Sequence, residues 1–135
     1  MLGNVDAGKT TMVGLLTSAP GLLDDGRGSM RANIFNFSHE ANNGRSSSIA
    51  NEIMGFSEDG QQVIPKHHVK HKAKRWPEIV NNSAKIINFT DLCGHEKYLK
   101  TTMHGLNSSH PDYCMIIVGA NMGISKMTKE HIGIA

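Results

Sequence analysis

GNVDAGKT at residues 3–10 decides the fold, because it fits the phosphate-binding loop pattern G-x-x-x-x-G-K-[ST] at every fixed position. Its two glycines let the backbone turn tightly, so successive N–H groups and the start of a following helix can face phosphate oxygens. Lys9 adds a positive charge for the β- and γ-phosphates, and the Thr10 hydroxyl is a ligand for Mg²⁺. The pattern predicts a nucleoside triphosphate site, and the alternative is a glycine-containing turn that matches by chance.

A second motif supports the first. KIINFTD at residues 85–91 is an apolar, β-prone segment that ends in an acid, and LCGH follows it directly. The segment therefore carries D-x-x-G after a strand. Asp91 at the end of this strand can hold the Mg²⁺ shell, and the Gly94 N–H can meet the γ-phosphate. A D-x-x-G alone is weak evidence, but its place about eighty residues after a phosphate loop makes it specific.

RSSSI at residues 45–49 is the candidate first switch. Switch segments become ordered when a hydroxyl and backbone groups reach Mg²⁺ and the γ-phosphate, and they relax after hydrolysis. Ser48 is the candidate for that hydroxyl, and Ser46 and Ser47 are possible substitutes. Three consecutive serines can also form a solvated loop with no such role.

With these motifs in place, the chain resembles the GTP-binding domain of translational GTPases related to elongation factor Tu and elongation factor 1-alpha. It most resembles the eukaryotic GTP-binding protein 1 and 2 family, through DGRG at 25–28, GRSSSIANEIMGF at 44–56, DLCGHEKYLKTT at 91–102 and MTKEH at 127–131. The similarity covers nearly the whole chain and is weakest over 57–84, where a variable insert between the two switch strands is expected.

The resemblance implies roles for the matching residues. It implies Lys9, Gly94 and His95 as catalytic residues, and Thr10, Ser48 and Asp91 as the metal ligands. Serine at position 48 replaces the usual threonine, and Cys93 replaces the usual proline or alanine. The nucleotide-binding residues that it implies are Asn4, Val5, Asp6, Ala7, Gly8, Lys9, Thr10 and Thr11.

His95 occupies the place of the histidine that positions the attacking water in the resembled family. Phosphoryl transfer has little need of a base, because positioning and charge stabilisation dominate its loose transition state. We therefore expect His95 to orient water rather than to abstract a proton. The alternative is a histidine that caps or packs against the start of a helix.

Composition is that of an ordinary domain, with 39 % hydrophobic and 19 % charged residues. The net charge of +2 is too small to indicate nucleic-acid binding, so no DNA partner is expected. Two cysteines suit a reducing compartment without disulfides. The sequence shows neither an eighteen-residue apolar stretch nor a charged leader, which predicts a cytoplasmic protein with no membrane partner.

Alternating strand and helix signals predict an α/β fold. The resemblance narrows this to a P-loop NTPase three-layer sandwich with a mostly parallel sheet. The 135 residues are expected to be a partial GTP-binding domain, a fragment that lacks most of the first strand and the carboxyl-terminal strands and helices. Expected helices cover 10–17, 77–82, 95–106 and the residues from 128 onward, with a helix and loop over 25–38; expected strands cover 51–56, 61–64, 85–91 and 113–119.

The span 66–76 holds five of the fourteen Lys and Arg residues and three of the eight histidines. His67 and His71 are four apart and could share a metal on a helix. The basic residues beside Trp76 could instead touch RNA phosphates, or the span could be a solvated insert. The basic residues considered for RNA are Lys70, Lys72, Lys74 and Arg75.

These observations predict GTP binding and Mg²⁺-dependent hydrolysis of GTP to GDP and phosphate. Guanine preference rests on the resemblance, because the sequence ends before any N-K-x-D motif. The resemblance also implies a translation or RNA-surveillance setting, with the ribosome, tRNA or RNA-decay machinery as partners. The alternatives are a nucleotide-dependent binding module with little hydrolysis, an ATP-using P-loop enzyme, and an inactive truncated product.

Overall fold

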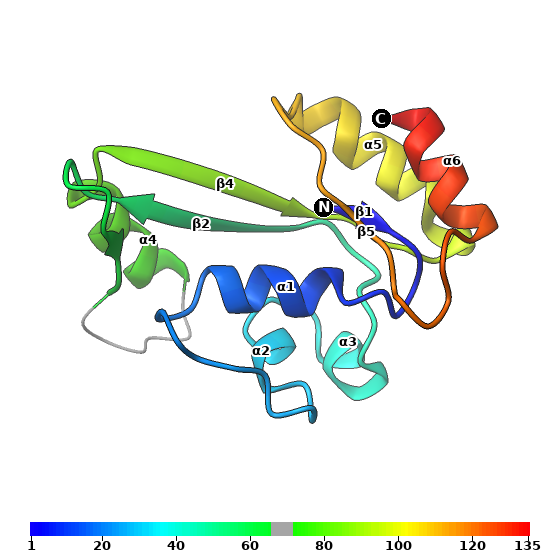
Figure 1. Cartoon of the computed structure of the whole chain (residues 1–135), viewed down its shortest axis with the longest axis horizontal. Helices are drawn as coiled ribbons and strands as arrows, with labels where there is room; N and C mark the ends of the chain where they lie inside the picture. Colours follow the sequence, from blue (N-terminus) through cyan, green and yellow to red (C-terminus); the bar gives the residue numbers. More distant parts are fainter. Residues whose placement is uncertain (66–71) are drawn as a thin grey trace.

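Helices and strands alternate along the chain in the computed structural model, which describes residues 1–65 and 72–135 (Figure 1). The fold is mixed α/β, as predicted from the sequence. None of the helices in the described ranges is long and apolar enough to cross a lipid bilayer. The elements in chain order are β1 (Leu2–Gly3), α1 (Lys9–Leu16), α2 (Ser29–Ala32), α3 (Ser38–Asn43), β2 (Ala50–Phe56), β3 (Gln62–Val63), α4 (Lys72–Asn81), β4 (Lys85–Asp91), the 3-10 helix η1 (Glu96–Tyr98), α5 (Leu99–Ser109), β5 (Ile116–Ile117) and α6 (Lys126–Ile134).

The longest strand pairing is antiparallel, between β2 and β4, with Ala50 opposite Asp91 and Phe56 opposite Lys85. Strand β3 adds to the other edge of β2, also antiparallel, because the short turn at 57–61 can join only antiparallel strands. The one parallel pairing among the described residues joins β1 to β5. The expectation of a mostly parallel sheet is therefore wrong for this part of the chain.

Strand β5 is much shorter than the apolar run at 113–119 predicts. Ile116 and Ile117 are the residues of this run that pair with β1. Tyr113 is 93 % exposed, and Met115 and Val118 are nearly half exposed. The expectation of a continuous strand covered on both faces is therefore wrong, because the apolar run extends beyond the backbone that pairs with it.

Helix α1 connects the phosphate loop to the core. It lies along the β2–β4 ribbon, and α2 and α3 lie on its other side (Figure 1). Val13 on α1 is fully buried and packs with Ile34 and Ala50, and Phe89 from β4 lies against this cluster. Burial of one such aliphatic side chain stabilises a fold by about 1.5–3 kcal/mol. The cluster therefore fixes the start of α1 near the end of β4.

Several helix bounds differ from the expected ones for local reasons. The region 25–38 forms the short helix α2 and leads into α3, which begins at Ser38. Helix α6 begins at Lys126 instead of Thr128, because the Ser125 side chain accepts a hydrogen bond from the Thr128 N–H at 3.2 Å and caps the helix.

Helix α4 begins five residues before the expected helix at 77–82, so Pro77 lies inside it and not in its first turn. The buried side chain of Ile79 and a buried acid hold α4 against β2. Glu52 of β2 has no exposed side-chain surface, and it pairs with Arg75 and, at 3.1 Å, with Lys72. These tertiary contacts offset the backbone hydrogen bond that a proline removes.

The same ion pairs bear on the proposed RNA contact. Lys72 and Arg75 are engaged by Glu52, and Lys72 also lies 6.0 Å from the centre of the Trp76 ring. Two of the basic residues considered for RNA binding therefore connect α4 to β2. His67, His71 and Lys70, which the metal and RNA hypotheses also use, lie outside the described residues.

Helix α6 is tied to the start of the phosphate loop through a buried histidine. The Gly3 N–H donates to His131 Nδ1 at 3.3 Å, across 128 positions of sequence. Burial, and next the nearby charge of Lys9, lower the pKa of His131. The imidazole is therefore neutral at physiological pH and can act as the acceptor.

We predict that Arg75→Ala loosens α4 from β2, because among the described residues it leaves the buried Glu52 carboxylate with the partly exposed Lys72 as its one ion-pair partner. Breaking a buried pair costs about 3–5 kcal/mol, and the remaining lysine lowers the expected loss to about 2 kcal/mol. Hydrogen exchange of the full-length protein should show amides of 50–56 and 72–81 exchanging roughly 30-fold faster. Lys74→Ala, at an exposed position of the same helix, is the control, and equal exchange in both variants would contradict the role of Glu52.

Candidate functional site

The loop before α1 has the backbone that close approach to a ligand requires. Gly8 has φ 92°, in the left-handed region that side chains with a Cβ rarely adopt, and it precedes the first residue of α1. Asp6 has φ 58° in the same loop, an uncommon conformation for a residue other than glycine. A turn of this kind aims backbone N–H groups at one point, which suits an anionic ligand.

Lys9 lies over the loop that precedes it. Its ammonium group donates to the Asn4 carbonyl at 2.8 Å, and the Ala7 N–H bonds to the same carbonyl at 3.4 Å. Gly94 from the second motif approaches this point so closely that a Cβ there would lie 2.7 Å from the Asn4 carbonyl oxygen and would clash with the Lys9 ammonium. Only glycine fits at position 94, so the second motif touches the phosphate loop directly.

The first and second motifs are also joined by a hydrogen bond. The Thr10 hydroxyl donates to Asp91 Oδ2 at 2.6 Å, although the two residues are 81 positions apart. The Ser46 hydroxyl joins them, 2.8 Å from Thr10 Oγ1 and 3.5 Å from Asp91 Oδ2. One residue from each of the three predicted motifs therefore meets at a single point.

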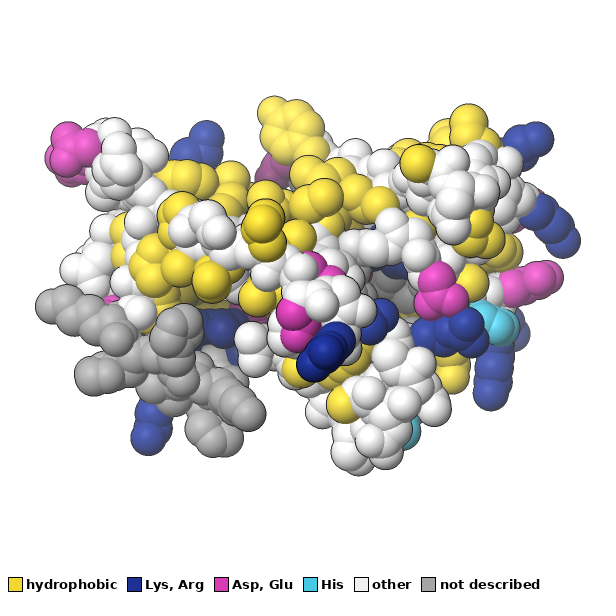
Figure 2. Space-filling view, turned by 60° about the horizontal axis from the view of Figure 1, so that its bottom comes forward, with side chains coloured by type: hydrophobic (Ala, Val, Ile, Leu, Met, Phe, Trp, Pro, Cys, Tyr) yellow, Lys and Arg dark blue, Asp and Glu magenta, His cyan; other side chains and the backbone are white. Residues whose placement is uncertain are grey.

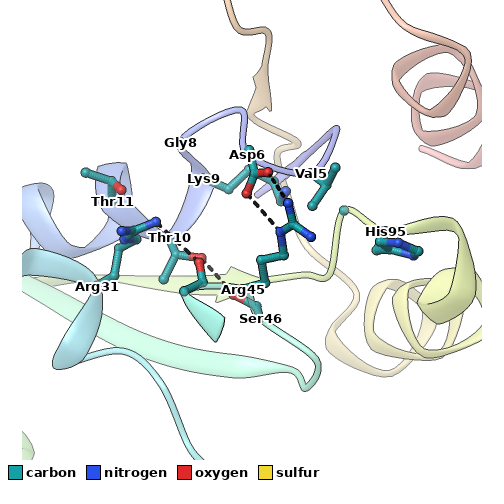
Figure 3. A pocket seen from close by; sticks show the side chains of 12 residues that line it. Val5, Asp6, Gly8, Lys9, Thr10, Thr11, Arg31, Arg45, Ser46 and His95 are labelled. Atoms are coloured by element: carbon teal, nitrogen blue, oxygen red, sulfur yellow. Dashed lines mark hydrogen bonds and ion pairs between the residues drawn. The ribbon is translucent and has the colours of Figure 1, made fainter. Parts of the chain in front are cut away.

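A cavity of about 250 Å³ opens beside this cluster. Arg45 reaches Asp6 at the cavity, with Nη2 2.8 Å from Asp6 Oδ2, and in the view of Figure 3 Thr10 lies to the left of Arg45 and Ser46 lies below it. Basic and acidic side chains gather toward the middle of the face shown in Figure 2, beside a broader area of hydrophobic side chains. The lining residues are Val5, Asp6, Gly8, Lys9, Thr10, Thr11, Arg31, Gly44, Arg45, Ser46, Gly94 and His95.

Burial perturbs both charged groups at the base of the site. It lowers the pKa of Lys9, although the charge of Asp91 opposes the shift. It raises the pKa of Asp91, against the hydrogen bond from Thr10 and the charge of Lys9. Desolvated groups of this kind are costly to keep charged, and they cluster at functional sites because a ligand of opposite charge relieves the cost.

The hydroxyl of Ser48 faces away from this cluster. It donates to Glu40 Oε1 at 2.9 Å and accepts from the Asn36 side-chain amide at 3.1 Å. Ser46 occupies the place beside Thr10 and Asp91 that the sequence assigns to Ser48. Ser46 is one of the substitutes that the run of three serines leaves open.

His95 lines the cavity and also caps the helix that follows it. Its Nδ1 accepts from the Lys97 N–H at 3.1 Å, and its ring lies edge-on to Tyr98. The ring is exposed and stands to the side of the Thr10 cluster (Figure 3). The structure thus shows His95 as a helix cap, and its water-orienting role stays a prediction.

Arg31 and Arg45 line the cavity, but sequence reasoning did not select their side chains. Arg31 comes from α2, and its guanidinium donates to the Gly44 carbonyl at 3.3 Å. No motif marks it, because only the tertiary fold brings α2 to the loop. Arg45 lies within the RSSSI segment, so its place directly before the serines was a usable signal. The two arginines and Lys9, set against Asp6 as the one acid among the described lining residues, give the lining a net positive charge.

Cys93 of the second motif is buried, and its thiol donates to the Ser48 carbonyl at 3.4 Å. Burial raises the pKa of this thiol to about 11. At pH 8 about one molecule in a thousand would carry the reactive thiolate.

We predict that Cys93 of the full-length protein alkylates at least about 100-fold more slowly than the exposed Cys114, because it is both buried and protonated. Peptide mass spectrometry after timed iodoacetamide treatment measures both rates in one sample. The Cys93 rate should rise with pH up to about 11, and in urea the two rates should converge. Similar rates in the native protein would contradict this assignment.

Comparison with known proteins agrees with this geometry. The family model "Elongation factor Tu GTP binding domain" matches residues 1–135. All 135 residues align with GTP-binding protein 1 of Xenopus laevis at 50 % identity and with GTP-binding protein 2 of Mus musculus at 47 %, covering 20 % and 21 % of those proteins. Elongation factor 1-alpha of Methanosphaera stadtmanae aligns with 97 % of the chain at 27 % identity, over 26 % of its own length.

The chain thus spans about a fifth of the length of its first two relatives. These matches confirm the resemblance that the motifs indicate. They cover both the phosphate loop at 3–10 and the second motif at 91–94, the two segments that meet at the cavity. The chain belongs to the elongation factor Tu GTP-binding domain family, within the translational GTPases.

Proposed function

We propose that this domain binds GTP with Mg²⁺ and hydrolyses it to GDP and phosphate, as a translation-factor-like molecular switch. One observation carries the proposal: the 2.6 Å hydrogen bond between Thr10 and Asp91 brings two motifs together beside a basic cavity. Lys9 and the loop N–H groups would hold the phosphates, with Asn4, Val5, Asp6, Ala7, Gly8 and Thr11 completing the loop.

The residues at the base of the cavity fit a divalent cation. Asp91 Oδ1 is buried and has no hydrogen-bond partner within the described part of the chain. Together with the Thr10 hydroxyl it offers the hard oxygen donors that Mg²⁺ prefers. When bound, Mg²⁺ neutralises charge on the phosphate oxygens and leaves its other positions to water and phosphate. The proposed protein ligands are Thr10, Asp91 and, when a triphosphate is bound, Ser48.

The proposed catalytic roles are based on the positions of three residues at the cavity. Lys9 would stabilise charge that develops on the phosphate oxygens, and the Gly94 N–H would donate to the γ-phosphate. His95, exposed at the cavity wall, would orient the attacking water. In the structure its Nδ1 accepts from the Lys97 N–H, which leaves Nε2 as the ring nitrogen for this task.

The wider setting is inferred from the family. We propose guanine as the base, a cytoplasmic location, and the ribosome, tRNA or RNA-decay machinery as partners of the full-length protein. The complete domain is proposed to be a three-layer sandwich, with residues 57–84 as a variable insert between the switch strands. The names of two aligned relatives, elongation factor 1-alpha and "Selenocysteine-specific elongation factor" of Haemophilus influenzae, support a connection with translation.

We predict that Lys9→Met abolishes tight triphosphate binding. The variant loses a charge-assisted hydrogen bond to phosphate, worth about 1.5–3 kcal/mol. Titration of a fluorescent GTP analogue into the full-length protein with Mg²⁺ should show affinity lower by about 10²-fold. Lys74→Met, at an exposed position far along the chain, should bind as the wild type does. Competition by GTP but not ATP distinguishes this domain from an ATP-using enzyme.

We predict that His95→Ala leaves GTP affinity within about threefold of the wild type and lowers single-turnover hydrolysis by about 10²-fold, the usual effect of a misplaced reactant. Single-turnover measurements on the full-length protein separate binding from chemistry. His104→Ala, an exposed histidine on α5, is the control. Equal hydrolysis rates in the His95 variant and the wild type would favour a binding module that hydrolyses GTP slowly by other means.

A further inference from the structure

Glu40 is a buried acid close to the candidate first switch, and no motif points to it. Its side chain is 1 % exposed, and its carboxylate accepts six hydrogen bonds. Oε2 accepts from the N–H groups of Asn36 and Phe37 at 2.9 and 3.1 Å, at the start of α3. Oε1 accepts from the N–H and the hydroxyl of both Ser47 and Ser48, at 2.7–2.9 Å.

These bonds keep the carboxylate charged. Burial alone would raise the pKa of Glu40, but the donors of Ser47, Ser48 and Phe37 together lower it. An ionised acceptor makes each bond stronger than a neutral one would. One carboxylate therefore fixes two segments to each other: the start of α3 and the second half of the serine run.

Ser48 has every polar group engaged in this arrangement. Its N–H and hydroxyl bond to Glu40, and its carbonyl accepts from the Cys93 thiol at 3.4 Å. Two residues earlier, the Ser46 hydroxyl lies 2.8 Å from Thr10 Oγ1. The position of Ser48 on Glu40 and the position of Ser46 at the metal site are thus two parts of one loop conformation.

We propose that Glu40 is a positioning residue that holds Ser48 away from the metal site, with Ser46 in its place, until a nucleoside triphosphate with Mg²⁺ draws Ser48 from Glu40. The inference rests on the proposed function and adds the element that sets its on and off states. A ligand shifts such an equilibrium only by binding one state more tightly. Because GDP lacks the third phosphate, it leaves Ser48 on Glu40, and Glu40 then determines how strongly the domain prefers GTP over GDP.

Glu40→Gln tests this directly in the full-length protein. The amide keeps the shape of the side chain, removes its charge, and presents an NH₂ group to one set of donors. The held loop conformation is weakened, so the ratio of GTP to GDP affinity in the presence of Mg²⁺ should rise about fivefold or more. Hydrogen exchange of the Ser47 and Ser48 amides without nucleotide should also become faster. Glu58→Gln, at an exposed acid in the β2–β3 turn, should change neither quantity.

Two serine variants complete the test. Ser47→Ala removes one hydroxyl bond to Glu40, together with the 2.7 Å bond to His39 Nε2, and leaves the Ser48 side chain in place. It should shift the ratio in the same direction by a smaller amount, and it provides the test if Glu40→Gln does not fold. Ser48→Ala should remove most of the preference for GTP, whereas Ser46→Ala should keep or raise it, because the Ser46 hydroxyl belongs to the held conformation. The opposite pattern, with Ser46→Ala losing the preference, would overturn the proposal.

The remaining outcomes are also decisive. A purely structural role for Glu40 would weaken GTP and GDP binding equally, and an unchanged affinity ratio in Glu40→Gln and Ser47→Ala would therefore overturn the proposal. Wild-type protein that binds neither nucleotide would instead contradict the proposed function. In that case faster exchange of the Ser47 and Ser48 amides in Glu40→Gln would still establish the carboxylate as the group that holds the loop.

Discussion

The hydrogen bond from Thr10 to Asp91 is the contact on which the rest of the site depends. It joins the first turn of α1 to the end of β4, two elements that the packing of Val13 and Phe89 already brings together. Without it, the phosphate loop and the D-x-x-G segment would be two unrelated patterns in the sequence. With it, Gly94 reaches the carbonyl of Asn4, and the loop, the strand end and the serine run share one cavity.

The charged groups of the site suit the binding of an anion and a cation together. Lys9 and Asp91 are both buried, and burial disfavours the charged form of each. Arg31 and Arg45 add positive charge at the wall and the mouth of the cavity. A folded domain keeps such unfavourable groups only where surrounding packing holds them, and here the aliphatic cluster under α1 supplies that packing.

The sequence predicts those parts of the site in which all the residues of a motif lie within one short segment. The phosphate loop at 3–10 and the acid and glycine at 91 and 94 follow from local spacing, and strands close to β2, β3 and β4 are expected, but the antiparallel pairing of β2 with β4 is not. Sequence spacing could not predict the roles of Arg31, Glu40 and Glu52. Their contacts join separate segments, and no local pattern indicates how the loops between those segments fold. The length of β5 was mispredicted because hydrophobicity does not reveal how much backbone is present to pair with it.

The bond between Gly3 and His131 links the nucleotide loop to the far end of the described chain. Gly3 is the first residue of the loop motif and His131 lies on α6, which also packs against β1. Neutral imidazole accepts at this nitrogen and imidazolium cannot. Protonation of His131 would therefore remove an acceptor that ties α6 to the backbone at the start of the phosphate-loop motif.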